Sequence, residues 1–129
     1  MTKIKVAVTD YVEANLDWEA EELSRRGVDF EFHQLNQADP PVLIAATRDA
    51  DIVIVNYAAI SAEIVAGWNK CRLVIRHGTG FNNLDLCALK RAGIQACYIP
   101  DYCIEEVAEH AIALILACGR RLQSCRKAL

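Results

Sequence analysis

The stretch DIVIV at residues 51–55 decides the fold class, because after its first residue it consists only of β-branched apolar side chains. Runs of this kind are typical of strands in a parallel sheet that is covered on both faces. Further short strands are expected at residues 4–9, 28–33, 73–76 and 94–99, with polar or helical segments between them. Strands that alternate with helices predict a parallel sheet built by right-handed crossovers.

Helical spacing fills the intervals between these strands. We expect helices over residues 13–26, 40–48, 61–65 and 85–92, and one long helix from residue 104 to about 121. The predicted fold is therefore α/β and flavodoxin-like, with a five-stranded parallel sheet, helices on both faces and a long C-terminal helix. The expected division is a domain over residues 1–103 and a helical segment over residues 104–129.

The composition and charge of the chain argue against several classes of function. The 129 residues are 53% hydrophobic and 24% charged, which is typical of a single globular domain. No apolar run approaches the roughly 20 residues that cross a bilayer, and no signal peptide is recognised, so a cytoplasmic protein without membrane attachment is expected. Seventeen acidic residues exceed 14 Lys and Arg, for a net charge of −3, which argues against nucleic-acid binding.

The cysteines and histidines do not form a recognisable metal site. The six cysteines lack the close Cys-x2–4-Cys spacing of zinc ligands, and neither His33 nor His77 has a second ligand at suitable spacing. Cys103 and His110 are seven residues apart, roughly 10 Å along a helix, which argues against a thiol and base pair. We expect no metal, and we expect reduced, buried cysteines at the following positions: Cys71, Cys87, Cys97, Cys103, Cys118 and Cys125.

Ligands of such sheets bind beyond the carboxyl ends of the strands. Gly78-Thr79-Gly80 follows a predicted strand there and could present backbone N–H groups to a carboxylate, although a plain tight turn explains the two glycines equally well. Asn83 stands where a dinucleotide-binding loop would have its third glycine. Asp10 and Asn56 occupy the places of the acidic residue and the phospho-acceptor of a receiver domain, but Asn56 cannot be phosphorylated. Nor does the segment after Asp10 contain the glycine-rich phosphate loop of a flavodoxin.

The long helix has an unusual distribution of side chains. Glu105 and Glu106 lie in its first turn and Arg120 and Arg121 near its end, which suits the helix dipole. Its middle, residues 111–118, is apolar on all sides, so we expect another surface to cover it. A homo-oligomer, most simply a dimer, formed through the helix over residues 104–121 is one such arrangement.

Four segments together carry a family resemblance: RHGTGFNNLD at 76–85, GI at 93–94, IPDY at 99–102 and EVAEHA at 106–111. The chain resembles the N-terminal region of the D-isomer-specific 2-hydroxyacid dehydrogenases. The resemblance implies an NAD- or NADP-dependent oxidoreductase that interconverts a small D-2-hydroxy acid and its 2-oxo acid. Residues 1–103 would form the substrate domain and residues 104–129 the helix leading to an NAD-binding Rossmann domain.

The resemblance also assigns roles to residues. It places the backbone of Gly78, Thr79 and Gly80 on the substrate carboxylate, Asn56 and Tyr57 at a polar pair of the substrate site, and Val107 beside the nicotinamide. The family's catalytic arginine, glutamate and histidine are expected beyond Leu129, so no catalytic residue is assigned.

Departures from the family pattern affect the expected ligands. Asn82 and Thr79 replace commoner residues of the glycine loop, and Asn56-Tyr57 has no cation, which favours a plain small acid over a phosphorylated one. Residues 1–129 alone are expected to be inactive and to bind no NAD. The alternative from another class is a non-catalytic flavodoxin-like module that binds a small carboxylate or a protein partner.

Overall fold

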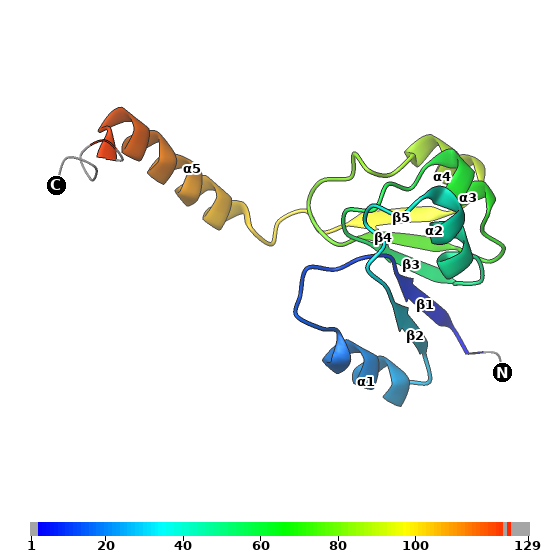
Figure 1. Ribbon diagram of the computed structural model, residues 1–129. Helices are drawn as coiled ribbons and strands as arrows, with labels where there is room; N and C mark the ends of the chain where they lie inside the picture. Colours follow the sequence, from blue (N-terminus) through cyan, green and yellow to red (C-terminus); the bar gives the residue numbers. More distant parts are fainter. Residues whose placement is uncertain (1–2, 123, 125–129) are drawn as a thin grey trace.

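The computed structural model describes residues 3–122 and residue 124 and confirms the predicted α/β fold. Five parallel strands form one sheet in the order β2-β1-β3-β4-β5, which is the flavodoxin-like order (Figure 1). The elements in chain order are β1 (Lys5–Val8), α1 (Asp17–Arg25), β2 (Asp29–Phe32), α2 (Pro40–Thr47), β3 (Ile52–Val55), α3 (Ala62–Ala66), β4 (Leu73–Arg76), α4 (Leu86–Arg91), β5 (Gln95–Tyr98) and α5 (Ile104–Gly119).

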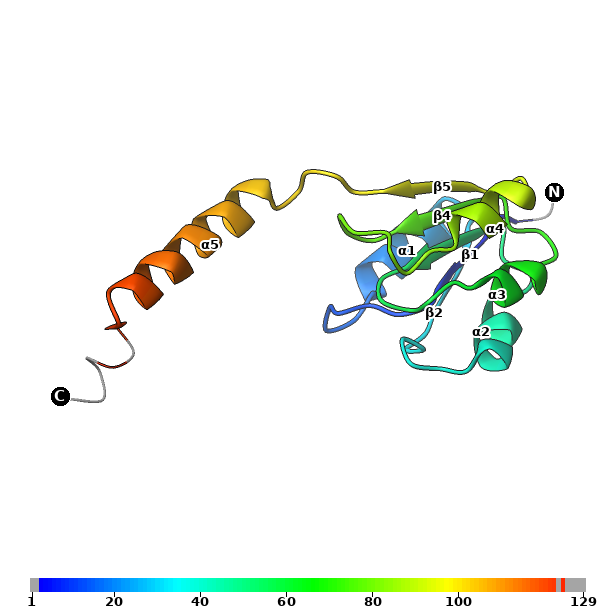
Figure 2. The ribbon, with the colours of Figure 1, turned by 90° about the horizontal axis from the view of Figure 1, so that it is seen from above.

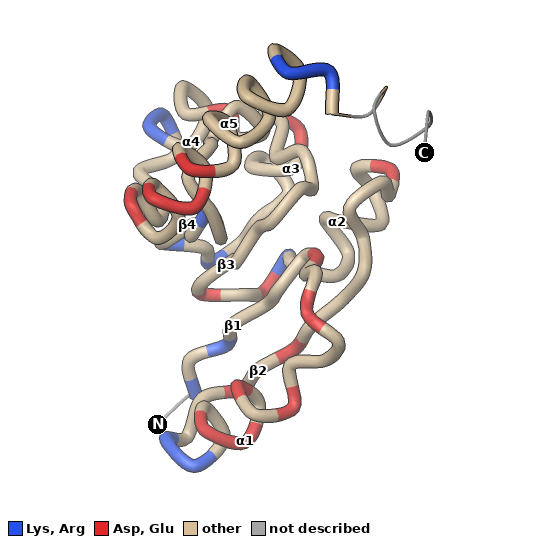
Figure 3. The backbone as a smooth tube through the Cα atoms, turned by 90° about the vertical axis from the view of Figure 1, so that its left-hand side faces the viewer, with Lys and Arg blue, Asp and Glu red and all other residues tan. Residues whose placement is uncertain are grey.

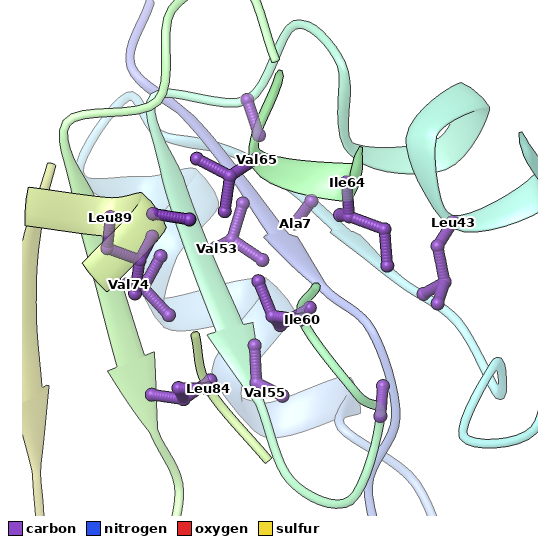
Figure 4. Close-up of a cluster of buried hydrophobic side chains, with 13 residues drawn as sticks. Ala7, Leu43, Val53, Val55, Ile60, Ile64, Val65, Val74, Leu84 and Leu89 are labelled. Carbon is purple, nitrogen blue, oxygen red and sulfur yellow. The ribbon is translucent and has the colours of Figure 1, made fainter. Parts of the chain in front are cut away.

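The hydrophobic core lies between one face of the sheet and the helices α2, α3 and α4. Val53 and Val55 of β3 and Val74 of β4 point to this face and are fully buried, as their alternation with half-buried neighbours requires. Ile64 of α3 and Leu89 of α4 close the core from the other side (Figure 4). Since α2, α3 and α4 follow one another in the same direction across the sheet, right-handed crossovers put them all on this face.

The opposite face carries α1 over β1 and β2. Leu16 and Leu23 at this helix face Phe30 of β2 across a cavity of about 250 Å³, which Ile54 and Ile75 also line. The edge strand β5 is exposed at all four positions. Figure 2 shows the sheet from above, with β5 at one edge.

The first helix is shorter than the helical spacing predicts. Helix α1 begins at Asp17 rather than at residue 13, because the backbone N–H of Asp17 is bonded to the side chain of Asn15 and Leu16 is buried as the N-cap. Residues between β1 and Leu16 therefore form a loop at the carboxyl edge of the sheet. The prediction of a helix from residue 13 is wrong by one turn.

The expectation of buried cysteines is also wrong. Cys87, Cys97 and Cys118 are exposed, and Cys71 and Cys103 are half-buried. Cys97 lies on the exposed edge strand and Cys118 on a helix of which no residue is buried, so apolar neighbours in the sequence did not imply burial. All five are free thiols, and Cys125 lies outside the described residues.

Helix α5 stands away from the rest of the molecule. It leaves β5 through residues 99–103 and projects into solvent, as Figures 1 and 2 both show. None of its residues is buried, and Ile112, Ile115 and Leu116 are 58%, 70% and 60% exposed. The middle of this helix is therefore apolar and exposed among the described residues, and the surface that is expected to cover it stays a prediction. No helix among residues 3–122 is both long and apolar enough to cross a bilayer.

Candidate functional site

A cavity of about 520 Å³ lies at the carboxyl edge of the sheet. Parallel strands bring the segments that follow β1, β3, β4 and β5 together here, which is where ligands of such sheets bind. Seven of the nine lining residues are polar, aromatic or charged, and Val12 and Ile99 are aliphatic: Val12, Glu13, Asn56, Tyr57, Arg76, His77, Thr79, Ile99 and Tyr102. This cavity is the candidate substrate site.

Asp10 fixes one wall of the cavity from behind. Its carboxylate is 2% exposed and accepts hydrogen bonds from the backbone N–H groups of Asn56, Tyr57 and Ala58, at 3.2, 2.6 and 3.2 Å. The hydroxyl of Thr9 donates a fourth bond at 2.7 Å. These four donors hold the buried carboxylate in one orientation. Asp10 is therefore a structural anchor of the β3–α3 loop and not the acidic residue of a receiver site.

Asn83 ties the glycine loop to the same β3–α3 loop. Its side-chain nitrogen donates to the carbonyl oxygens of Asn56 and Ala58, at 3.2 and 2.9 Å. A short parallel bridge between Ile60 and Leu84 continues this contact. Asn83, which stands at the position of a third glycine, therefore holds the two loops in register.

Arg76 supplies a cation that the sequence reading missed. It is the last residue of β4, its guanidinium lies 5.9 Å from the ring centre of Tyr57, and its Nη1 donates to the carbonyl of His77 at 2.8 Å. Its Nε is buried and has no hydrogen-bond partner within residues 3–122. Arg76 therefore retains donor capacity next to the cavity that it lines.

Gly78 has φ +151°, a backbone conformation that L side chains rarely adopt. The guanidinium of Arg76 crosses over this residue, so a Cβ there would also displace Nη1 of Arg76. Gly80, in contrast, has open space around its Cα, so it lacks that steric reason for being glycine. The aromatic ring of Phe81 packs against Tyr98 of β5 at 5.3 Å and holds the far end of the loop.

Two phenols and two titratable side chains complete the lining. Tyr57 and Tyr102 are 60% and 64% exposed, and a hydrogen bond with Cys103 raises the pKa of Tyr102. On the side of the β1–α1 loop, Nδ1 of His77 lies 4.0 Å from Oε1 of Glu13. The cavity thus combines a cation, an imidazole, a carboxylate and hydroxyl groups, a set suited to a small polar acid.

The structure separates the residues that the sequence singled out. Asn56, Tyr57 and Thr79 all line the main cavity, but Asn56 is buried and is bonded through its backbone, whereas Tyr57 is exposed. Gly80 lines an adjoining pocket of about 220 Å³ with Arg76. Val107 lies elsewhere, in an apolar groove of about 400 Å³ at the start of α5, and Thr79 borders both spaces.

One premise of the sequence reading needs correction. Asn56-Tyr57 has no cation of its own, but the fold places Arg76 beside Tyr57, so the argument against a phosphorylated substrate fails. An arginine that ends an otherwise apolar strand just before a glycine loop was the available signal. No cluster of three metal-ligating side chains occurs in the part of the chain that the structure describes.

Comparison with known proteins now adds to the geometry. The sequence model of the D-isomer specific 2-hydroxyacid dehydrogenase catalytic domain matches residues 6–124. The chain belongs to this family. A D-3-phosphoglycerate dehydrogenase of Mycobacterium tuberculosis is 33% identical over 104 residues, which are 80% of this chain and 20% of the relative. A hydroxypyruvate reductase of Thermotoga maritima is 28% identical over 95% of this chain and 39% of its own length.

The fold has close counterparts among solved structures. An acyclic imino acid reductase in complex with NADPH and D-Arg superposes with a TM-score of 0.83 at 26% identity, covering 97% of this chain and 41% of the reductase. The chain thus spans about a fifth to two fifths of the length of these relatives. Family relatives are oxidoreductases, and the structural neighbour binds a nicotinamide cofactor and a small molecule.

Proposed function

We propose that this chain is the substrate-binding portion of an NAD- or NADP-dependent oxidoreductase that interconverts a small D-2-hydroxy acid and its 2-oxo acid. The cavity at the carboxyl edge of the sheet carries the proposal, because Arg76, His77 and Thr79 reach it from β4 and the glycine loop. Its 520 Å³ would hold an acid of several carbons. Family membership supports the reaction class.

The proposed contacts follow from the chemistry of the lining. The substrate carboxylate lies against the backbone of Gly78-Thr79-Gly80 and the guanidinium of Arg76, which favours an anion by charge and by N–H donors. Tyr57 and Tyr102 face the remainder of the acid. With Arg76 present, both phosphorylated and plain acids are compatible with the site.

The cofactor contact is proposed for the groove beside α5. Its lining is apolar, with Pro100, Ile104 and Val107, which suits one face of a nicotinamide ring. Thr79 borders this groove and the substrate cavity, so the two ligands would meet there. A bound nicotinamide would supply or accept the hydride, and the residues of this chain would hold the acid next to it.

We further propose that the protein is a homo-oligomer that associates through the helix over residues 104–121, with residues 1–103 as the substrate domain and residues 104–129 as the interdomain segment. The exposed apolar side chains of α5 support the association. The five free thiols suit the reducing cytoplasm.

The test of the proposed function is a binding measurement on the 129-residue chain. Pyruvate, hydroxypyruvate, 3-phosphoglycerate and the inert analogue oxamate are titrated while backbone amide signals are followed by NMR. We expect the amides of residues 78–80 to shift, and Arg76→Gln to weaken binding by at least about tenfold because a charged donor is lost. Arg91→Gln, on the exposed end of α4, is the matched control. Unchanged affinity in Arg76→Gln, or shifts elsewhere only, would refute the assignment.

A further inference from the structure

In the part of the chain that the structure describes, Glu13 is the single acidic residue that lines the candidate substrate cavity. It belongs to the loop between β1 and α1, whereas Arg76 enters the same cavity from the end of β4. The side chain of Glu13 is 38% exposed, so a ligand in the cavity can contact its carboxylate. The cavity therefore carries one cationic and one anionic side chain, which come from different strand ends.

The carboxylate of Glu13 retains capacity to accept a hydrogen bond from a ligand. Its Oε2 accepts from the backbone N–H of Val12 at 3.0 Å, which fixes the side chain against its own loop. Its Oε1 lies 4.0 Å from Nδ1 of His77, which is beyond hydrogen-bond distance. Within residues 3–122, Glu13 forms no ion pair with a lysine or arginine. Oε1 is thus the oxygen that a donor group of a ligand would contact.

The sequence around Glu13 adds negative charge on the same side of the cavity. Residues 6–24 contain no lysine or arginine. Figure 3 shows acidic residues along this segment and basic residues only at the end of α1. A second anionic group of a ligand would meet repulsion here, because no nearby cation offsets the acidic side chains. The acidic residues of this segment are Asp10, Glu13, Asp17, Glu19, Glu21 and Glu22.

We propose that Glu13 is a specificity-determining residue, which selects acids that carry a hydrogen-bond donor, best an ammonium group, at the end away from their carboxylate. The substrate carboxylate lies at Arg76 and the glycine loop, and the distant group donates to Oε1 of Glu13. A carboxylate or phosphate ester at that end is disfavoured, since it would lie against a like charge. This inference rests on the proposed function and specifies the class of its substrate.

The test compares three D-2-hydroxy acids that have the same five-carbon chain and differ only at the last carbon. They are 5-amino-2-hydroxypentanoate, 2-hydroxypentanoate and 2-hydroxyglutarate, which end in an ammonium, a methyl and a carboxylate group. Each is titrated into the 129-residue chain at constant ionic strength while the amide signals of residues 78–80 are followed by NMR. We expect the ammonium acid to bind at least about tenfold more tightly than the dicarboxylate, with the methyl acid between them.

Three variants assign this preference to Glu13. Glu13→Gln keeps the size of the side chain but removes its charge, so the preference for the ammonium acid over the dicarboxylate should fall below about threefold. Glu13→Lys should reverse the order of the two acids. Glu19→Gln removes a charge from α1 at a position that does not line this cavity, so it should leave the preference within about twofold of wild type. Circular dichroism checks that each variant is folded.

The outcomes separate this inference from the proposed function. A dicarboxylate that binds as tightly as the ammonium acid would overturn the role of Glu13, as would a preference that Glu13→Gln leaves unchanged or that Glu19→Gln reduces equally. The proposed function would then stand, because the acids still bind at the glycine loop. If none of the three acids shifts the amides of residues 78–80, both the proposed function and this inference are wrong.

Discussion

Asp10 holds the candidate site together although it does not line the cavity. Four donors surround its buried carboxylate, and three of them are consecutive backbone N–H groups of the β3–α3 loop. A sequence reader sees only an acidic residue after a strand, a position shared by several kinds of site. The distinction depends on contacts between residues about 46 positions apart, which no local pattern encodes.

Replacing Asp10 tests this anchoring role. Asp10→Asn keeps the shape but turns an N–H₂ group toward backbone donors, so we expect the free energy of unfolding to fall by about 1–3 kcal/mol. The affinity for the acid should fall as well, because the β3–α3 loop loses its support. Urea denaturation measures the first effect, with the exposed Asp101→Asn as the control. A change as small as that of the control would contradict the anchoring role.

Cys71 gives the molecule a specific response to alkaline pH. Burial raises the pKa of its thiol to about 11 from an ordinary value of 9.0. Between pH 9 and 11 the unfolded chain therefore binds fewer protons than the folded chain, so stability falls as the pH rises through this window. The loss should be about 1–2 kcal/mol by pH 11.

The measurement compares wild type with Cys71→Ala in urea at a series of pH values from 8 to 11. The variant should lose less stability across the window, since its unfolded state has no thiol to ionise at this position. Lys5, whose pKa is raised by its hydrogen bond to Glu31, contributes equally to both proteins and cancels in the difference. Parallel curves for the two proteins would rule out the role of Cys71.

At the scale of elements, helices α4 and α5 both carry apolar side chains, but only α4 buries them. Helix α4 buries Ala88 and Leu89 against the sheet, whereas α5 buries nothing. Hydrophobic pattern predicted both helices correctly, but it could not tell which one packs onto this domain. The position of β5 at the sheet edge explains the difference, because the chain leaves the sheet there instead of crossing back over it.

A pair of equal truncations measures this difference. Leu89→Ala, at a position 1% exposed, should lower the free energy of unfolding by about 2–5 kcal/mol because it leaves a cavity in the core. Leu114→Ala, at a position 54% exposed, should cost less than about 0.5 kcal/mol. Equal costs in urea denaturation would show that α5 packs against the domain in solution.

At the scale of the whole molecule, helices cover one face of the sheet and leave much of the other face open. Helices α2, α3 and α4 cover one face, and on the other face α1 covers only β1 and β2. The strand order and parallel pairing follow from the alternation of strands and helices, which the sequence displays plainly. The openness of β5 and the exposure of three cysteines depend on what covers the sheet, and the local sequence does not contain that information.

The reactivity of the thiols measures how well the surrounding structure covers each cysteine. At pH 8, alkylation should modify the exposed Cys87 and Cys97 first and Cys71 last, because Cys71 is half-buried and its raised pKa leaves little thiolate. Cys118 should also react early, since it is exposed. Peptide mass spectrometry at increasing times gives the order. Early modification of Cys71 would contradict the described packing.

The difference between local sequence pattern and long-range contact also explains how much of the candidate site could be predicted from the sequence. Strand alternation located the site at the carboxyl edge, and the paired glycines identified the loop. Arg76 was missed because an arginine at a strand end has no periodic signature, and its value arises only from crossing Gly78 toward Tyr57. The sequence predicts Val107 on the nicotinamide side; it lines an apolar groove separate from the main cavity, and its contact with a cofactor stays a prediction.

The anchoring of the β3–α3 loop through Asp10 and Asn83 has a consequence for how this site can diversify. Both anchors bind backbone atoms, so they hold the loop whatever side chain stands at position 57. Tyr57 and Tyr102 are largely exposed and do not belong to the core. Under the proposed function, exchanges at these two positions would change the substrate preference and leave the scaffold unchanged. A library confined to positions 57 and 102 should yield mostly folded proteins with altered acid preferences.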